Sequence, residues 1–333
     1  MITRRKFVKD LAFAGCAGAL GYGPQLLAAE PPPETIRIRL PQIPSTCQAP
    51  LYVCEEFLRA EGFTDVRYVK YPGAENVAPA LAAGEIDLMQ EFAGKFIVDV
   101  DAGHPAVALG GVHPGCFMLF GSGQIRSVRE LKGKRVAISG INSGQHMIAA
   151  VIMAHVGVDP RRDIEWVVLK GAEMVPQLAA GKVDAAGTAA ELCQEFMEKK
   201  IGNCLVNTTL DRPWSHYFCC MLAGHRDFVR KHPVATKRAM RAILKGADLC
   251  AANPQAVARI LVSRGVTSDY ERGLRAIQDL PYARWRDLNP EDTLRFYGVR
   301  LHEAGYVKSS PAKIIAQGTD WRFLNELKKE LKG

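Results

Sequence analysis

The chain lacks the short motifs that mark many enzyme families. It contains no HExxH helix, no GxSxG nucleophile elbow, no P-loop and no glycine-rich dinucleotide fingerprint. Each absence argues against one class of enzyme, because the missing motif would supply the metal ligands, the nucleophile or the phosphate-binding loop that the class requires. We therefore expect no catalytic residues and no cofactor, and a protein that binds its ligand without transforming it.

Nucleic-acid and metal signatures are also missing. No stripe of Lys and Arg with interleaved aromatics is present, which argues against a nucleic-acid partner. The nine cysteines form no C-x-x-C pair and show no metal-like spacing with the eight histidines, so we expect no metal site. Cys47 and Cys54 lie seven apart, and we do not expect them to pair. Cys219 and Cys220 are neighbours, which is typical of small hydrophobic residues buried in a strand.

The N-terminus carries an export pattern. Residues 3–9 read TRRKFVK, which resembles the bacterial twin-arginine signal, and residues 11–29 carry no charge. The small residues 27–29 form a cleavage site, so residues 1–29 are interpreted as a signal peptide and the mature protein as periplasmic. Removing them takes away four basic residues and one acidic residue, and the net charge falls from +8 to +5. A second interpretation is a lipid anchor at Cys16, because residues 13–16 partly fit a lipobox.

Two stretches of the chain nearly repeat each other. Residues 73–87 read GAENVAPALAAGEID and residues 171–184 read GAEMVPQLAAGKVD. Each copy follows a strand-like segment, 66–71 or 164–169, and runs into a second apolar segment, 86–89 or 183–186. The pattern predicts strand, turn, short helix and strand, with Gly84 and Gly181 at helix ends that require positive φ. Two equivalent units indicate two similar α/β lobes.

The remaining segments place the lobes along the chain. Further strands are predicted at 36–40, 107–111 and 116–120, one helix from Thr46 to Ala60, and almost only helices from Arg226 onward. We expect the chain to cross between lobes near 121–124 and to return near 222–224. Lobe I then comprises residues 35–121 and 224–333, and lobe II comprises residues 122–223. Each lobe is a mixed sheet flanked by helices, and a cleft between lobes is a typical site for a small ligand.

Several short motifs carry a resemblance to a known family. They read APLY (49–52), AAGEID (82–87), IRSVRELKGK (125–134), SGQH (143–146), GVDP (157–160) and AAGKVDA (179–185). The chain resembles periplasmic solute-binding proteins of ABC importers, of the nitrate/sulfonate/taurine and thiamine-pyrimidine-precursor type. The resemblance implies a two-lobed type II periplasmic-binding-protein fold that acts as a monomer. It also implies a ligand that is a nitrate-, sulfonate- or taurine-like anion or a small heteroaromatic, delivered to an ABC permease and ATPase complex at the inner membrane.

Four loops are predicted to form the ligand site: 42–48, 91–94, 140–146 and 188–191. In open α/β sheets ligands lie beyond the carboxyl ends of strands, near helix N-termini whose free amides favour an anion. The candidate ligand-binding residues are Gln42, Thr46, Gln48, Glu91, Phe92, Ser139, Ser143, Gly144, His146, Thr188, Glu191 and Trp214.

Several of these residues have a second interpretation. By the resemblance His146 occupies the place of a loop histidine of the family, but it could equally cap or pack in the first helical turn. Thr46 could act as a helix cap, and Trp214 could serve packing instead of stacking on a flat ligand. Glu91 and Glu191 decide the charge of the ligand: if both face the cleft, a neutral or amine-bearing ligand fits, and if both point outward, an anion fits.

An enzyme of the same fold is the rival hypothesis. Desulfinases of similar fold use a nucleophilic cysteine after the first strand, and Cys47 is in about that place. Their arginine-glycine partner motif is missing, since residues 71–73 read YPG. The pyrimidine-precursor synthases of the yeast type carry a CCCFC motif, which residues 218–221 (FCCM) do not match. We therefore expect a binding protein.

Overall fold

The computed structural model describes residues 30–331. The expected signal peptide, with its twin arginine and Cys16, lies outside the described residues. Within the described part, no helix combines the length and the apolar character that crossing a membrane requires.

Within residues 30–331, ten strands form three sheets, which confirms the mixed α/β fold class. One sheet pairs β1 (Arg37–Gln42) in parallel with β2 (Asp65–Lys70). A second, antiparallel sheet has the order β3-β10-β4, with β3 (Leu88–Phe92), β4 (Ala106–Pro114) and β10 (Phe218–His225). The third has the order β7-β6-β8-β5-β9, with β5 (Phe117–Gly121), β6 (Lys134–Ile138), β7 (Ile164–Val168), β8 (Ala185–Ala189) and β9 (Asn203–Asn207).

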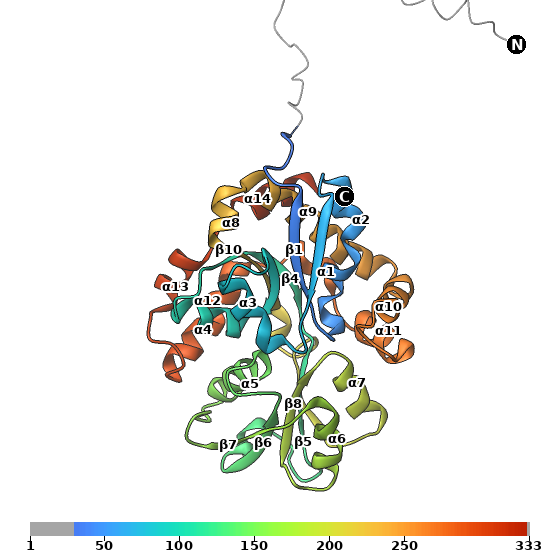
Figure 1. The fold of residues 1–333 in the computed structure, drawn as a ribbon. Helices are drawn as coiled ribbons and strands as arrows, with labels where there is room; N and C mark the ends of the chain where they lie inside the picture. The colour runs from blue at the N-terminus through green and yellow to red at the C-terminus, as the bar shows by residue number, and fades with distance from the viewer. Residues whose placement is uncertain (1–29, 332–333) are drawn as a thin grey trace, which may run out of the picture. The chain divides into compact units, whose positions relative to one another are not determined.

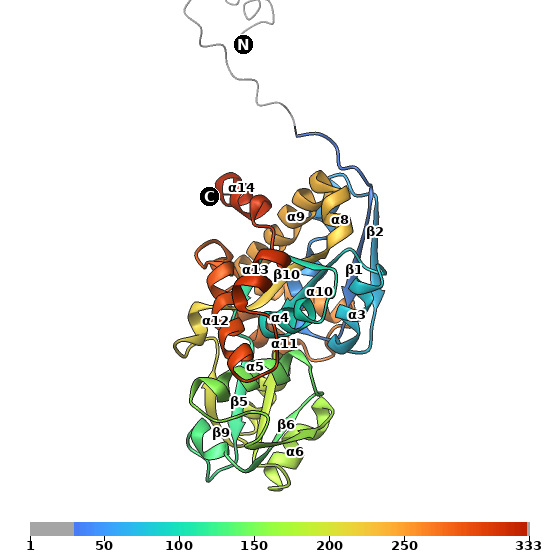
Figure 2. The ribbon, with the colours of Figure 1, turned by 90° about the vertical axis from the view of Figure 1, so that its left-hand side faces the viewer.

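Helices cover these sheets in two groups. The five-stranded sheet carries α5 (Gly144–His155), α6 (Gly171–Ala179) and α7 (Glu191–Glu198), as Figures 1 and 2 show. The other sheets carry α3 (Val77–Ala82), α4 (Ala93–Asp101) and the expected C-terminal run of helices. That run comprises α8 (Arg226–Lys231), α9 (Pro233–Ala252), α10 (Pro254–Ser263), α11 (Tyr270–Gln278), α12 (Pro290–Glu303), α13 (Pro311–Gly318) and α14 (Arg322–Glu330).

The helix predicted from Thr46 to Ala60 is divided into three pieces. They are the 3-10 turn η1 (Thr46–Gln48), α1 (Ala49–Val53) and α2 (Glu55–Ala60). Cys54 interrupts the helix with ψ near 0°, and its thiol donates to the carbonyl of Leu51 at 3.3 Å. The short pieces allow α1 to pack on α9 while η1 remains at the end of β1.

Both copies of the repeat form the predicted strand, turn, helix and strand. In each copy the closing aspartate accepts hydrogen bonds from the backbone and the guanidinium of an arginine on the neighbouring strand. Asp87 binds Arg39 in this way, and Asp184 binds Arg135. Each arginine also donates to the carbonyl of the helix-ending glycine, Gly84 or Gly181, and these glycines have the expected positive φ of 71° and 67°.

The chain passes between the sheets earlier than predicted. Residues 117–121 pair with β8 and β9 of the five-stranded sheet, so the outgoing connection is Gly115-Cys116 and not 121–124. Both residues of that connection have φ of 81°. Residues 218–225 pair with β3 and β4, so the return lies between β9 and β10 and not at 222–224. The predicted boundaries fail because two apolar strands in sequence order do not reveal which sheet each one joins.

Candidate ligand-binding cleft

A cavity of about 350 Å³ lies where the carboxyl ends of strands from different sheets meet. One side is formed by the loop after β1, the first turn of the first repeat copy, and the ends of β3 and β10. The other side is formed by the segments after β6 and β8 and by the first turn of α6. Its lining comprises residues 43–48, 72–75, 91–92, 139, 143, 145, 171, 174, 188–192 and 220.

Most of the predicted site residues line this cavity. They are Thr46, Gln48, Glu91, Phe92, Ser139, Ser143, Thr188 and Glu191. All of them lie at or just after the carboxyl end of a strand or begin a helix, which is the placement that the rule for open α/β sheets predicts. Their contact with a ligand remains a prediction.

Gln42 and Gly144 do not line the cavity. The side-chain amide of Gln42 donates to the carbonyl of Arg264 at 3.0 Å, which turns it toward the C-terminal helices. Gly144 opens α5, and a Cβ placed on it would stand 2.2 Å from the ring of Phe92. The absence of a side chain at Gly144 thus allows Phe92 to reach the cavity wall.

His146 and Trp214 are packing residues in this structure. His146 is 3 % exposed, accepts from the backbone N–H of Asn142 at 2.9 Å, and has its ring centroid 4.5 Å from that of Trp166. Burial lowers the pKa of His146 to about 4. Trp214 is buried edge-on against His155 and lines a separate surface hollow. Neither residue lines the cavity, which favours the packing interpretation, and their contact with a ligand stays a prediction.

The sequence prediction missed cavity residues from the repeat itself. Gly73, Ala74 and Glu75 come from the turn of the first copy, and Gly171 and Met174 come from the second. The repeat was the available signal, because it places equivalent turns at the carboxyl ends of β2 and β7.

The charge of the cavity is carried by glutamates. Among residues 30–331, Glu75, Glu91 and Glu191 line it, and no lysine, arginine or histidine does. Burial raises the pKa of Glu91 to about 8 and that of Glu191 to about 7. Both residues line the cavity, and the raised pKa values favour their neutral carboxyl forms near neutral pH. Which of the two sequence alternatives holds for the charge of the ligand stays a prediction.

Three lining oxygens have no hydrogen-bond partner within the described part of the chain. They are Thr46 Oγ1, Gln48 Oε1 and Glu191 Oε1, and all are shielded from solvent. The side-chain nitrogen of Gln48 donates to the carbonyl of Gln90 at 3.1 Å, whereas the side-chain oxygen of Gln48 has no donor among the described residues. Because a buried acceptor without a donor is costly, these oxygens indicate a ligand that supplies N–H or O–H groups.

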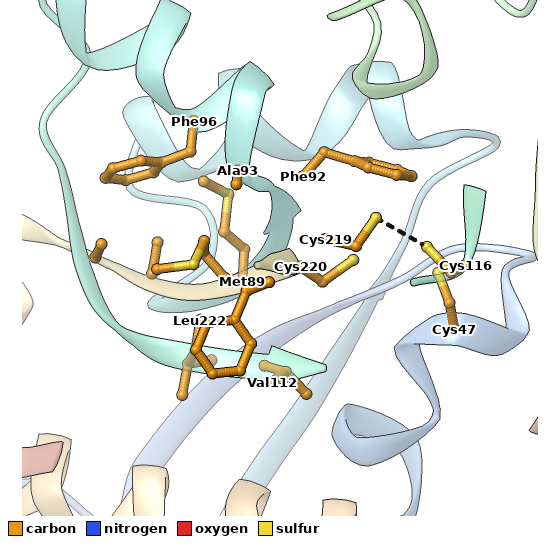
Figure 3. Close-up of a cluster of buried hydrophobic side chains, with 14 of the residues drawn as sticks. Cys47, Met89, Phe92, Ala93, Phe96, Val112, Cys116, Cys219, Cys220 and Leu222 are labelled. Carbon is orange, nitrogen blue, oxygen red and sulfur yellow. Dashed lines mark hydrogen bonds between the residues drawn. The ribbon is translucent and has the colours of Figure 1, made fainter. Parts of the chain in front are cut away.

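Four cysteines and a histidine meet at one edge of the cavity. Cys47 and Cys220 line it, and Figure 3 shows Cys116 and Cys219 beside them. His113 Nε2 lies 3.2 Å from the carbonyl of Cys47. The metal-ligating atoms of Cys47, His113, Cys116 and Cys220 all lie within 4.8 Å of one another. The expectation of no metal-like grouping overlooked the H-x-x-C spacing of His113 and Cys116.

The histidine and the thiols of this group influence each other's protonation. Burial opposes a charge on His113, but the hydrogen bonds and charges of Cys220 and Cys47 outweigh it and raise the pKa of His113 to about 10. The net pKa of Cys220 lies well below its usual range. Burial alone would raise it, but hydrogen bonds from neighbouring thiols and the charge of His113 outweigh burial. All eight cysteines of the described residues are free thiols.

Comparison with known proteins gives a family and a fold. A family model described as NMT1/THI5 like matches residues 46–257. A search of curated proteins found no match. The structure is similar to the periplasmic nitrate-binding protein NrtA from Synechocystis PCC 6803, with a TM-score of 0.75, 17 % identity and 90 % of each chain covered.

Two sulfonate-binding proteins are also similar. The alkanesulfonate-binding protein SsuA from Xanthomonas axonopodis pv. citri, bound to MOPS, has a TM-score of 0.67 and 18 % identity, over 88 % of this chain and 100 % of that one. The periplasmic aliphatic sulphonate binding protein SsuA from Escherichia coli has a TM-score of 0.66 and 16 % identity, over 85 % and 91 %. At these identities the likeness shows a shared fold.

Proposed function

The chain belongs to the NMT1/THI5-like family, and from this we propose that it is the solute-binding component of an ABC importer. It captures a small molecule in the periplasm and delivers it to a permease and ATPase complex at the inner membrane. One observation carries the proposal: a single cavity is lined from both groups of sheets, at the strand ends where such folds bind small ligands.

We propose a division into two lobes, which the separate sheets support. Lobe I comprises residues 35–114 and 218–331, and lobe II comprises residues 117–207, with the short connections 115–116 and 208–217 between them. Glu91 and Thr46 belong to lobe I, whereas Thr188 and Glu191 belong to lobe II. A ligand that touches both sides stabilises the closed arrangement, because only there are all its contacts made.

The ligand is a protonated amine or an amino-bearing heteroaromatic, not an oxyanion. The lining presents three glutamates and buried oxygens without partners, which favour N–H donors, and the ionised form of Glu191 favours positive charge. Nitrate or a sulfonate would find no lysine, arginine or histidine to pair with among the described lining residues. The similar proteins from Synechocystis and Escherichia coli bind nitrate and sulfonates by their names, so the proposed ligand class separates this chain from them.

The ligand is bound without turnover. The rival hydrolase would need a reactive Cys47, yet this residue is 2 % exposed. The Cys116 thiol lowers the pKa of Cys47, but Cys220 and burial outweigh it and raise that pKa. A thiol whose pKa is raised is a poor nucleophile at neutral pH.

A thermal-shift screen of the mature protein, residues 30–333, tests the proposal. The panel contains nitrate, alkyl and aryl sulfonates, protonated amines and aminopyrimidines. A ligand present at about 100 times its Kd stabilises the fold by about 2.7 kcal/mol. We expect such shifts from amines or aminopyrimidines and none from nitrate or sulfonates. A shift from the anions alone would overturn the ligand class, and chemical change of a bound ligand would overturn the binding role.

A further inference from the structure

Four buried side chains from distant parts of the chain converge beside the cavity. Their ligating atoms lie within 4.8 Å of one another, and none of the four residues is more than 5 % exposed. We call this group the Cys-His cluster; it consists of Cys47, His113, Cys116 and Cys220. Figure 3 shows the cysteines of the cluster turned toward one another from different segments of the chain.

We propose that the Cys-His cluster binds one zinc ion in a closed tetrahedral site. Three thiolates and one imidazole are a donor set of structural zinc sites. With Zn–S distances of about 2.3 Å, sulfurs at the corners of a tetrahedron stand about 3.8 Å apart. The spacing of the cluster is therefore close to that of a zinc-bound set, and small side-chain rotations complete the geometry. The proposal is independent of the proposed function.

The surroundings of His113 suit a metal ligand. Its Nδ1 lies 3.2 Å from the carbonyl of Pro114, and its Nε2 lies 3.2 Å from the carbonyl of Cys47. Whichever nitrogen binds the metal, the other can donate its N–H to a backbone carbonyl. Such a bond fixes the tautomer and the ring orientation, as partners of metal-bound histidines usually do.

The backbone also directs Cys116 into the cluster. Its φ of 81° is unusual for a residue with a side chain. This conformation is held by hydrogen bonds, because the N–H of Ala190 donates to the carbonyl of Cys116 at 3.0 Å and the N–H of Cys116 donates to Thr209 Oγ1 at 3.3 Å.

A zinc ion here would join both connections between the sheets. His113 lies next to the last residue of β4 and Cys116 belongs to the outgoing connection, whereas Cys220 lies in β10 just after the return. Cys47 lies in η1, and with Cys220 it forms part of the cavity lining. With all four positions taken by protein, the ion fixes the edge of the cleft and the start of both connections, and does not activate water.

The competing state is a disulfide. Cys219 lies outside the cluster, but its sulfur is 3.2 Å from that of Cys116. An oxidant that joined these two sulfurs would remove one zinc ligand, so the zinc-bound and disulfide states exclude each other. The two states differ in metal content and in the number of free thiols.

Metal content of the mature protein tests the inference. The protein is produced with zinc in the medium, purified without chelator and analysed by inductively coupled plasma mass spectrometry. We expect about one zinc per chain for the wild type and for the control Cys250→Ser, which alters a buried thiol outside the cluster. Cys116→Ser and Cys220→Ser should each lose most of the metal.

Cobalt titration keeps the test valid if a variant fails to fold. Zinc is removed from the wild type with a chelator under reducing conditions, and Co²⁺ is added. Tetrahedral thiolate ligation should give intense visible bands and near-ultraviolet thiolate-to-cobalt charge transfer, saturating at about one equivalent. Substoichiometric zinc together with no such spectrum would overturn the proposal. An intact Cys116–Cys219 disulfide in protein purified with zinc, shown by peptide mass mapping, would also overturn it.

Discussion

At the scale of single residues, a substitution at His146 should change the stability of the fold but not the affinity for the ligand. Its ring packs against Trp166 and Tyr306 and does not line the cavity. We expect His146→Ala to lower the free energy of unfolding by about 1–3 kcal/mol while ligand affinity changes little. Urea denaturation and calorimetric titration measure the two quantities. A large loss of affinity in a variant that remains folded would show that His146 contributes to ligand binding.

The lowered pKa of His146 also makes the stability of the fold depend on pH. Burial lowers the pKa of His146 to about 4, below the 6.5 of the unfolded chain. The unfolded state therefore binds more protons between these values, and the stability that the neutral ring contributes is present above pH 6.5 and is lost as pH falls toward 4. In His146→Ala this part of the pH dependence should disappear.

Glu191 makes ligand affinity depend on pH. Its pKa is raised to about 7 by burial, against the opposing effects of Thr267 and Arg272, while Asp269 adds to the rise. A cationic ligand prefers the carboxylate, so its affinity should increase about tenfold from pH 6 to pH 8 if the ligand stays protonated.

A matched pair of variants tests this dependence. Glu191→Gln should remove the rise centred near pH 7 and leave the part that Glu91 contributes at higher pH, whereas the control Glu165→Gln, on the exposed edge of β7, should leave the profile unchanged. An affinity that falls as pH rises would indicate an anionic ligand.

At the scale of elements, the two repeat copies differ in how much their ion pairs contribute. The side chain of Asp87 is 6 % exposed, whereas that of Asp184 is 26 % exposed. We expect Asp87→Asn to cost about 2–3 kcal/mol of unfolding free energy and Asp184→Asn about 1 kcal/mol, because the more exposed pair is better screened by solvent. Urea denaturation of both variants gives the comparison, and equal losses would contradict it.

The repeat units were predictable because they are local. Each one carries its strand, turn and helix pattern within a short stretch, and its loops lie at strand ends where ligands bind. The crossings between sheets were not predictable in this way, since they depend on which distant strand residues 117–121 pair with. The burial of His146 and Trp214 likewise depends on Tyr306, from the connection after α12, and on Phe296, from α12 itself. The members of the Cys-His cluster are far apart in the sequence. The spacing of His113 and Cys116 is the one local pattern that could have indicated the cluster.

At the scale of the whole molecule, the proposed role requires export. The twin arginine at residues 4–5 predicts the twin-arginine route, which carries folded proteins. Changing both arginines to lysine should leave the precursor in the cytoplasm, as fractionation and immunoblotting would show, while a variant with Lys9→Arg should be exported. Normal export of the double-lysine variant would rule out this route.

We propose that the cleft binds a positively charged, N–H-bearing solute between two lobes. The most direct measurement is calorimetric titration of the mature protein with a matched pair of ligands: the amine that gives the largest thermal shift, and the sulfonate of the same carbon skeleton. We expect saturable binding of the amine, weakened at least about tenfold in Glu191→Gln, and no measurable binding of the sulfonate. Tight binding of the sulfonate with no binding of the amine would contradict it.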